Sequence, residues 1–248
     1  MIQLKNENDI KGLRSSCSLL ADLHKHLESE VKPGMSTGEI DQYIHEFISS
    51  GGGTPAFLGY MGFPASACIS VNEQIIHGIP GSYVIQPSDI VSIDIGIELG
   101  GYYSDAAQTI CMQEVDPEVK KMVDVTRESL YLGIQQVIPG NRVSHIGKAV
   151  SEHVQQYGYG VVREYCGHGV GFSQHEDPQV PNYPSSTANQ RLRNGMVLAI
   201  EPMVNFGTPR ISHLDDNWTV VTADRLPSAH WEHTVVLFHD AVEILTEW

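Results

Sequence analysis

The sequence predicts a mixed α/β (α+β) fold in which two similar halves place strands inside and helices outside. Three observations support this prediction: four amphipathic helical segments, several short apolar runs, and an internal duplication. The chain has 248 residues, 41% of them hydrophobic, and a mean hydropathy of −0.16, so it can bury a substantial core. We expect one domain over residues 1–248, with pseudo-repeat lobes at approximately 1–115 and 116–248.

Four segments have the residue spacing of amphipathic helices. Residues 6–31 carry apolar side chains at intervals of three and four, which gives one buried stripe. Ser36 and Glu39 have the spacing of a capping box and predict a second helix, which the glycines at 51–53 end. The two helices expected in the second half run from Pro117 to about Gln136 and from Ser144 to Tyr157.

Short apolar runs between these helices have the composition of β-strands. The expected strands are Ala67–Val71, Ile90–Glu98, Tyr102–Met112, Met196–Val204, Trp218–Thr222, Thr234–Phe238 and Val242–Leu245.

The second half of the sequence repeats features of the first. A Val-x-Pro-Gly segment leads into a helix at Val31 and again at Val137. Two further pairs correspond, namely Ser88–Asp94 with Gly195–Glu201 and His77–Pro80 with His175–Pro178. A period of about a hundred residues indicates two duplicated lobes and not a solenoid.

The charge balance and the cysteines exclude several classes of protein. The formal net charge is −15 and the pI is near 5.1, so nucleic acid and anionic membrane are poor candidates for the main ligand. The four cysteines are scattered without a CxxC pair, which predicts neither a disulfide framework nor a thiolate metal site. No signal-peptide core or membrane-spanning run is present, and we expect a cytoplasmic protein.

Two acids stand inside apolar strands. Asp94 lies in the run Ile90–Gly96 and Glu201 in the run Met196–Pro202, where an unpaired carboxylate has a large desolvation cost. No lysine or arginine lies within either strand to offset that cost, and the two acids occupy matching places in the duplication. We therefore interpret both as functional.

Each of these acids has a later companion, Asp105 for Asp94 and Glu232 for Glu201. Asp94 and Asp105 are eleven residues apart with two glycines between them, as in a hairpin that sets two acids side by side near a turn. Either companion alone would more often be a solvated strand end. The pairing favours a shared site.

Histidines complete the candidate set. His168 lies between glycines in Cys166–Gly171, where the backbone and the ring can approach a ligand closely. His77 and His175 each begin a His-x-x-Pro turn. We interpret six others as structural, namely His24, His26, His45, His145, His153 and His239, and leave His213, His230 and His233 undecided.

Together these residues predict a site for two divalent cations. Four carboxylates balance the four positive charges of two ions, and one to three imidazoles add nitrogen donors. Without thiolates, such a set suits Mn²⁺, Fe²⁺, Co²⁺ or Zn²⁺. Bound water becomes acidic at such a site, which favours hydrolase chemistry.

The same residues, in order and spacing along nearly the whole chain, resemble the type I methionine aminopeptidases in their short bacterial form. The matching motifs are Asp94, Asp105, Cys166–Gly171, His175–Val180, Ile200–Met203 and Trp231–Thr234, with Gly59–Pro64, Val71–Pro80 and Trp218–Arg225. The resemblance implies the "pita-bread" fold, in which two pseudo-symmetric lobes hold an inner antiparallel sheet and outer helices. It also implies removal of N-terminal methionine from nascent proteins and peptides whose second residue is small.

The resemblance implies roles for individual residues. The metal ligands would be Asp94, Asp105, His168, Glu201 and Glu232, with Asp105 and Glu232 bridging two ions. Glu201 would also act as the general base, while His77 and His175 would steady the substrate amide and its oxyanion. The methionine pocket would be lined by Tyr60, Phe63, Cys68 and Trp218. The expected partners are peptides and nascent chains with N-terminal methionine, and the protein would be a monomer; the acidic balance offers no basic patch for ribosomal RNA.

The sequence departs from the family pattern at four positions. Gln174 stands before His175 where an apolar residue is usual, and Phe57 replaces a small residue or cysteine. Trp231 stands where tyrosine is usual, and Phe172 where arginine is frequent. We expect Gln174 and Phe57 to alter the substrate pocket.

Three rival interpretations remain at this stage. The first is a same-fold Xaa-Pro aminopeptidase or prolidase, although those usually carry an additional N-terminal domain. The second is a non-catalytic relative that binds partners, although such proteins typically lose ligands. The third is a creatinase-like hydrolase that works without metal. Peptide preference and metal content discriminate among them.

Overall fold

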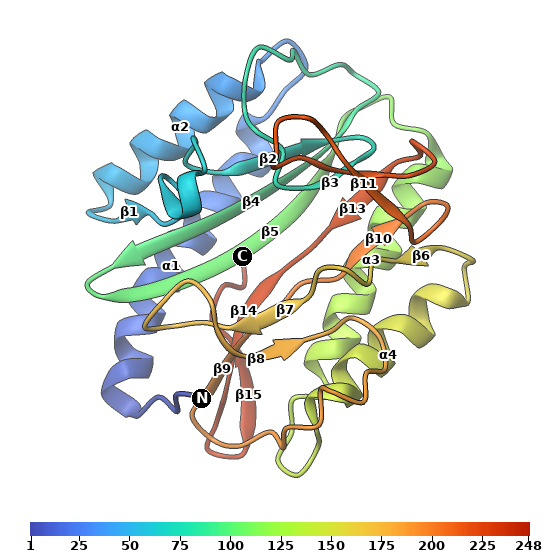
Figure 1. Ribbon diagram of the computed structural model, residues 1–248. Coiled ribbons are helices and arrows are strands. Elements are labelled where there is room, and N and C mark those ends of the chain that lie inside the picture. Colours follow the sequence, from blue (N-terminus) through green and yellow to red (C-terminus); the bar gives the residue numbers. More distant parts are fainter.

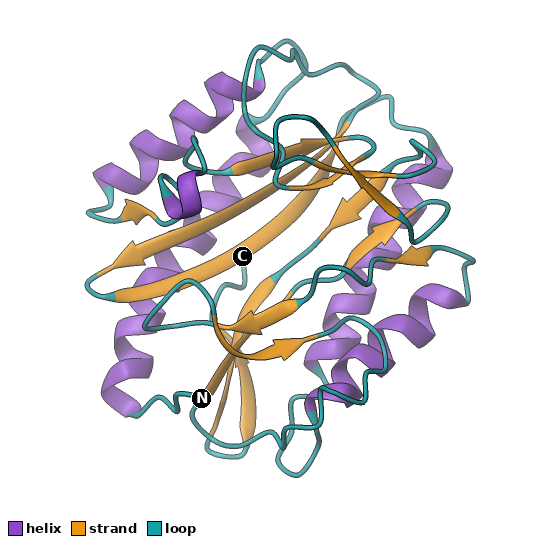
Figure 2. Cartoon of the chain, in the orientation of Figure 1, coloured by secondary structure: helices purple, strands orange, loops and turns teal.

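The computed structural model describes all 248 residues. Four α-helices lie on the outside of the molecule and the strands lie between them (Figures 1 and 2). The helices are α1 (Glu7–Glu30), α2 (Thr37–Ser50), α3 (Pro117–Ile134) and α4 (Val143–Gln155). This arrangement confirms the predicted fold class. No helix has both the length and the apolar character needed to cross a membrane.

The helix ends follow the sequence signals closely. Asn6 caps α1 in a capping box with Asp9. The predicted capping box of α2 is present, since Glu39 donates its backbone N–H to Ser36 Oγ at 3.2 Å and accepts from Ser36 N at 2.7 Å. Pro117 stands in the first turn of α3, where its missing N–H costs nothing.

The first half of the chain forms a four-stranded antiparallel sheet. Its order is β1-β4-β2, and β5 pairs with β4. The strands are β1 (Thr54–Pro55), β2 (Cys68–Val71), β4 (Ile90–Leu99) and β5 (Tyr102–Cys111). Apolar side chains of α1 and α2 pack against β2 and β4 in one buried cluster.

The second half forms a five-stranded antiparallel sheet of order β15-β14-β9-β7-β8. Its strands are β7 (Gly167–Gly169), β8 (Glu176–Val180), β9 (Met196–Ile200), β14 (His233–Phe238) and β15 (Ala241–Ile244). Here α3 and α4 supply the covering apolar side chains.

Two smaller sheets complete the fold. One has the order β13-β10-β6, with β6 (Gly160–Val161), β10 (Met203–Asn205) and β13 (Ser228–His230). The other has the order β11-β12-β3, with β3 (Gln74–Ile76), β11 (Ile211–His213) and β12 (Val220–Thr222). In the second of these sheets, Ile76 of the first half pairs with Val220 of the second half. A short 3₁₀ helix, η1 (Tyr60–Gly62), lies between β1 and β2.

The single strand expected over Met196–Val204 is wrong. The structure has β9 and β10 there, in different sheets, with Glu201 and Pro202 between them. Pro202 has no N–H to donate to a ladder, so pairing is interrupted at this point. Glu201, which we expected inside a strand, therefore lies directly after β9.

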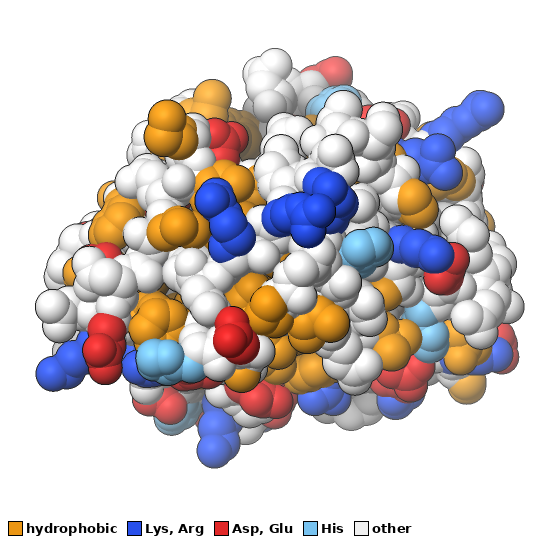
Figure 3. All heavy atoms as spheres, turned by 90° about the horizontal axis from the view of Figure 1, so that it is seen from below, with side chains coloured by type: hydrophobic (Ala, Val, Ile, Leu, Met, Phe, Trp, Pro, Cys, Tyr) orange, Lys and Arg blue, Asp and Glu red, His pale blue; other side chains and the backbone are white.

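One face of the protein carries side chains of both charges. On the face shown in Figure 3, basic, acidic and apolar side chains are interspersed, and none of these kinds covers the face alone.

Candidate metal centre and adjoining pocket

Strand register brings three of the predicted acids together. Asp94 on β4 pairs with Ala107 on β5, and Ala107 forms a bridge with Glu232. Laterally paired residues point to the same face of a sheet. Asp105 stands two residues before Ala107, so its side chain leaves β5 on that face as well. The three carboxylates therefore share one side of the sheet.

The hairpin between Asp94 and Asp105 forms as predicted, with one difference. Gly100 and Gly101 make its turn, with φ values of +62° and +86° that favour glycine. Because both strands are ten residues long, the acids lie well away from this turn. Asp105 pairs with Gly96 and not with Asp94, so the two acids are diagonal neighbours.

The second half of the chain contributes an imidazole and the fourth acid. His168 on β7 pairs with Ala199 on β9, and Glu201 follows β9 directly. The Nε2 atom of His168 lies 3.5 Å from Asp105 Oδ2 and 3.6 Å from Glu201 Oε1. One ligand atom each from Asp105, His168 and Glu232 lies within 4.8 Å of the others. All five residues line one cavity.

Burial and the neighbouring charged groups shift the pKa values of these acids in different directions. Burial, then Asp105 and Glu201, raises the pKa of Asp94 well above its ordinary value. Burial, then the neighbouring carboxylates, likewise raises the pKa of Glu232. Burial also acts to raise the pKa of Glu201, but the imidazoles of His230 and His168 outweigh it, and that pKa is lowered. Glu201 is therefore ionised more readily than Asp94 or Glu232.

These donors fit a divalent cation. Asp94 Oδ1, Asp105 Oδ1 and Glu232 Oε1 are buried and have no hydrogen-bond partner. The lysine and arginine ion pairs of the protein all involve other acids. Buried, unpaired carboxylate oxygens are costly unless a cation meets them. Oxygen and imidazole donors of this kind suit Mn²⁺, Fe²⁺, Co²⁺ and Zn²⁺.

A cavity of about 280 Å³ adjoins the acids. Its other lining residues are Phe57, Tyr60, Met61, Phe63, Cys68, His77, His175 and Trp218. Phe63 and Trp218 meet edge to face with ring centroids 5.1 Å apart. Cys68 pairs with Asp94 across β2 and β4, so the apolar end of the cavity begins next to the acids. Burial, then Asp94 and Asp105, raises the pKa of the Cys68 thiol, which keeps it protonated.

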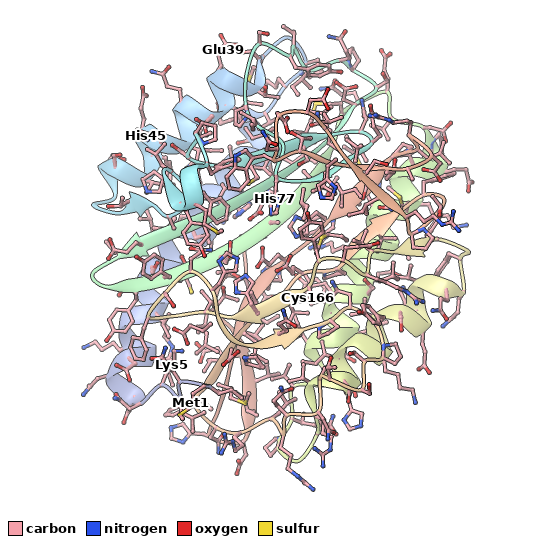
Figure 4. All side chains as sticks on the ribbon, viewed as in Figure 1. Met1, Lys5, Glu39, His45, His77 and Cys166 are labelled. Atoms are coloured by element: carbon pink, nitrogen blue, oxygen red, sulfur yellow. The ribbon has the colours of Figure 1, made fainter.

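The two predicted histidine turns both reach this cavity. His77 has a left-handed φ of +58° and stands edge-on to the rings of Tyr165 and Trp218. Burial lowers its pKa to about 4. Figure 4 shows His77 near the middle of the molecule, between the sheets of the two halves. The ring of His175 is 4.2 Å from that of His168, and its Nδ1 is 3.1 Å from the Tyr60 hydroxyl.

Of the two departures expected at the pocket, only Phe57 lines it. Gln174 is 2% exposed and lies behind the wall, where its Nε2 donates to Asp105 Oδ2. Gln174 is not among the residues that line the cavity, and its amide donates to Asp105, which is; a contact between Gln174 and substrate stays a prediction.

A buried ion pair holds the loop that carries Gln174 and His175. Lys5 Nζ bonds Glu176 Oε2, and both side chains are nearly inaccessible to solvent. Glu176 also accepts from the backbone N–H of Phe172 at 2.6 Å. Lys5 lies close to Met1 in the lower left of Figure 4 and does not line the cavity, so the N-terminal segment anchors the loop from outside the cavity.

His230 is a residue of this site whose part the sequence left undecided. It is buried, and its Nε2 lies 3.7 Å from Glu201 Oε2 with no hydrogen-bond partner. Its place two residues before Glu232 was the one available signal. His213 instead contacts the Tyr165 hydroxyl at 3.0 Å, and His233 bonds Thr246 away from the acids.

Sequence comparisons identify close relatives along the whole chain. The model of metallopeptidase family M24 matches residues 11–238. A methionine aminopeptidase of Clostridium perfringens is 48% identical over 246 residues, which is 99% of each chain. Methionine aminopeptidase 1 of Bacillus subtilis is 47% identical with the same coverage.

Solved structures give a consistent result. The methionine aminopeptidase of Thermotoga maritima superposes with a TM-score of 0.97 at 38% identity, over 100% of both chains. That of Rickettsia prowazekii gives 0.96 at 35% identity, over 99% of this chain and 100% of the other. The prolidase of Pyrococcus furiosus gives 0.80 at 22% identity and is covered over 65% of its length, a likeness of fold alone.

Proposed function

The chain belongs to the methionine aminopeptidases of metallopeptidase family M24, and from that premise we propose that it removes N-terminal methionine from peptides and nascent proteins with a small second residue. The family also confirms the pita-bread fold that the sequence motifs implied. One observation carries the proposal: the buried acids with unpartnered oxygens stand at the end of an apolar cavity. The Xaa-Pro alternative is not favoured, since prolidases share only the fold.

Members of this family use divalent metal. We propose two ions, held by Asp94, Asp105, His168, Glu201 and Glu232, because four carboxylates neutralise four positive charges. When bound, such ions polarise a carbonyl group and make water more acidic.

Glu201 is suited to move the proton during hydrolysis. Its lowered pKa keeps the carboxylate ionised, and it lies among the imidazoles of His168 and His230. We propose that Glu201 accepts a proton from the attacking water and delivers it to the departing amino group. The water oxygen forms a C–O bond with the carbonyl carbon of methionine, the peptide C–N bond breaks, and the amine leaves with the proton that Glu201 took from the water.

His77 and His175 are suited to bind the scissile amide. Burial lowers the pKa of His77 to about 4, and burial, then His168, lowers the pKa of His175. Both rings are therefore neutral near pH 7 and can donate an N–H without adding charge to the site. We propose that they stabilise the carbonyl oxygen as negative charge develops on it.

The apolar part of the cavity is suited to the methionine side chain. Tyr60, Phe63, Cys68 and Trp218 line it. A thioether is polarisable and flexible, so it packs well against aromatic faces and edges. We propose that, with the side chain bound there, the free amino group and the first peptide bond lie beside Glu201.

The test is cleavage of short peptides by ion-free protein refilled with Mn²⁺, Fe²⁺, Co²⁺ or Zn²⁺. We expect release of methionine from Met-Ala-Ser, little from Met-Lys-Ser, and none without added metal. Preferential cleavage of an Xaa-Pro peptide would overturn the methionine assignment. Indifference to chelators would overturn the metal site itself.

A further inference from the structure

Gln174 makes a contact that the catalytic roles above do not use. Its side chain is 2% exposed, and its Nε2 donates to Asp105 Oδ2. Its Oε1 is buried and has no hydrogen-bond partner. A buried amide whose nitrogen has a hydrogen-bond partner but whose oxygen has none carries a desolvation cost. An apolar side chain in its place would avoid that cost.

The contact with Gln174 restricts the rotation of the Asp105 side chain. Its backbone is fixed by Thr234, whose Oγ1 accepts from Asp105 N at 3.1 Å and donates to Asp105 O at 2.7 Å. The carboxylate can still rotate about its side-chain torsions. Gln174 and His168 both lie against Oδ2, whereas Oδ1 is unpartnered. The amide therefore fixes which oxygen of Asp105 stays free.

The backbone opposite Asp105 is shaped to admit the amide. Gly96 pairs with Asp105, and a Cβ atom there would lie 2.8 Å from Gln174 Oε1 and from Phe57 Cε1. The amide and the aromatic ring thus share the space that glycine leaves. Gln174 and Phe57, the two residues at this site that depart from the family pattern, therefore both lie against Gly96.

We infer that Gln174 is a positioning residue that orients the Asp105 carboxylate for cation binding and does not contact the peptide. This inference rests on the proposed metal site but not on the methionine specificity. Hydrogen bonds to ligating carboxylates commonly change metal affinity by about 10–100-fold. Gln174 would thus act on the metal site through Asp105, from behind the cavity wall.

The test compares Gln174→Met with Phe57→Leu, since each removes one of the two groups above Gly96. Titration calorimetry of ion-free protein with Mn²⁺ should show about tenfold weaker binding for Gln174→Met. Its Tm without metal should stay within a few degrees of that of the natural protein, because the loss of the unpartnered Oε1 offsets the loss of the donor to Asp105. Phe57→Leu should bind Mn²⁺ as the natural protein does, with its change confined to KM for Met-Ala-Ser.

Two results would overturn the inference. One is unchanged Mn²⁺ affinity in Gln174→Met together with a changed KM, which would make the residue part of the pocket. The other is an equal loss of affinity in both variants, which would assign the effect to packing. Gly96→Ala in the Phe57→Leu background offers a second route to the same answer, since with the ring removed its methyl group crowds chiefly the amide while Gln174 remains; this variant too should weaken Mn²⁺ binding. If the natural protein binds Mn²⁺ but cleaves no methionyl peptide, the proposed function fails and this inference does not.

Discussion

The cavity has two regions built on different kinds of backbone. The acid floor, defined here as Asp94, Asp105, His168, Glu201 and Glu232, lies on paired strands or directly beside them. The aromatic rim, defined as Phe57, Tyr60, Met61, Phe63 and Trp218, lies on loops and the short helix η1. Within the rim, Met61 has a left-handed φ of +48° and is 83% exposed.

This difference in backbone assigns the chemical step to the acid floor and the selection of substrate to the aromatic rim. Ladder hydrogen bonds fix the floor, so small changes in side-chain length or charge there should cost turnover. The rim has fewer backbone constraints, so changes there should alter binding more than turnover. Variants in each region can test this division.

The largest effect is expected in the floor, from Glu201→Gln. The amide keeps the shape of the side chain but cannot accept the proton, so kcat should fall by about 10³-fold or more. Circular dichroism should show the fold unchanged. Glu243→Gln, which affects only an ion pair with Arg14 on the surface, is the matched control and should keep full turnover. Near-normal kcat in Glu201→Gln would refute its role as the base.

A smaller loss is expected from His175→Ala, between the floor and the rim. Removing one donor to a developing oxyanion costs about 10²-fold in kcat, with little change in KM. His26→Ala, on the exposed face of α1, is the control and should behave as the natural protein. If KM rises while kcat holds, His175 binds substrate without stabilising the transition state.

In the rim, Trp218→Leu should raise KM for Met-Ala-Ser by about tenfold while kcat stays within a few-fold. The ring forms an edge-to-face contact with Phe63 that a leucine side chain cannot replace. Trp248→Leu is the matched control, because that ring stacks on His24 and does not line the cavity. A loss confined to kcat in Trp218→Leu would break the proposed division between the regions.

The smallest effect concerns stability and not rate. At pH 8 without metal, the natural protein must either bury a charged Asp94 or keep it protonated against its ordinary pKa, and both are costly. Asp94→Asn avoids both, so its Tm should exceed that of the natural protein by a few degrees.

Added Mn²⁺ should then raise the Tm of the natural protein more than that of the variant. The control is Asp124→Asn, which alters only an exposed pair with Lys120. A lower Tm for metal-free Asp94→Asn would contradict the repulsion inferred among the acids.

Much of this architecture was predictable from local signals. The capping box of Ser36, Pro117 at the start of α3 and the glycine turn of the β4–β5 hairpin all act through neighbouring residues, and each forms as expected. The five floor residues were also predicted to converge, because charged groups in apolar runs have few alternatives to a shared site.

Other features depend on contacts between distant segments. The interruption at Glu201 and Pro202 becomes a change of sheet only because β10 finds partners in β6 and β13. His230 approaches Glu201 from another strand, and nothing near it in sequence specifies that distance. Gln174 was expected at the pocket, but the free space above Gly96 directs it toward Asp105.

The sheet formed by β11, β12 and β3 has a consequence for assembly of the chain during synthesis. A nascent fragment that ends near residue 115 holds β3 but lacks β12, the strand that satisfies its edge. Such a fragment also lacks the segment around Glu232 that bonds Ala107. We therefore expect the two halves of the chain to fold cooperatively after the C-terminal portion has emerged, and not one after the other.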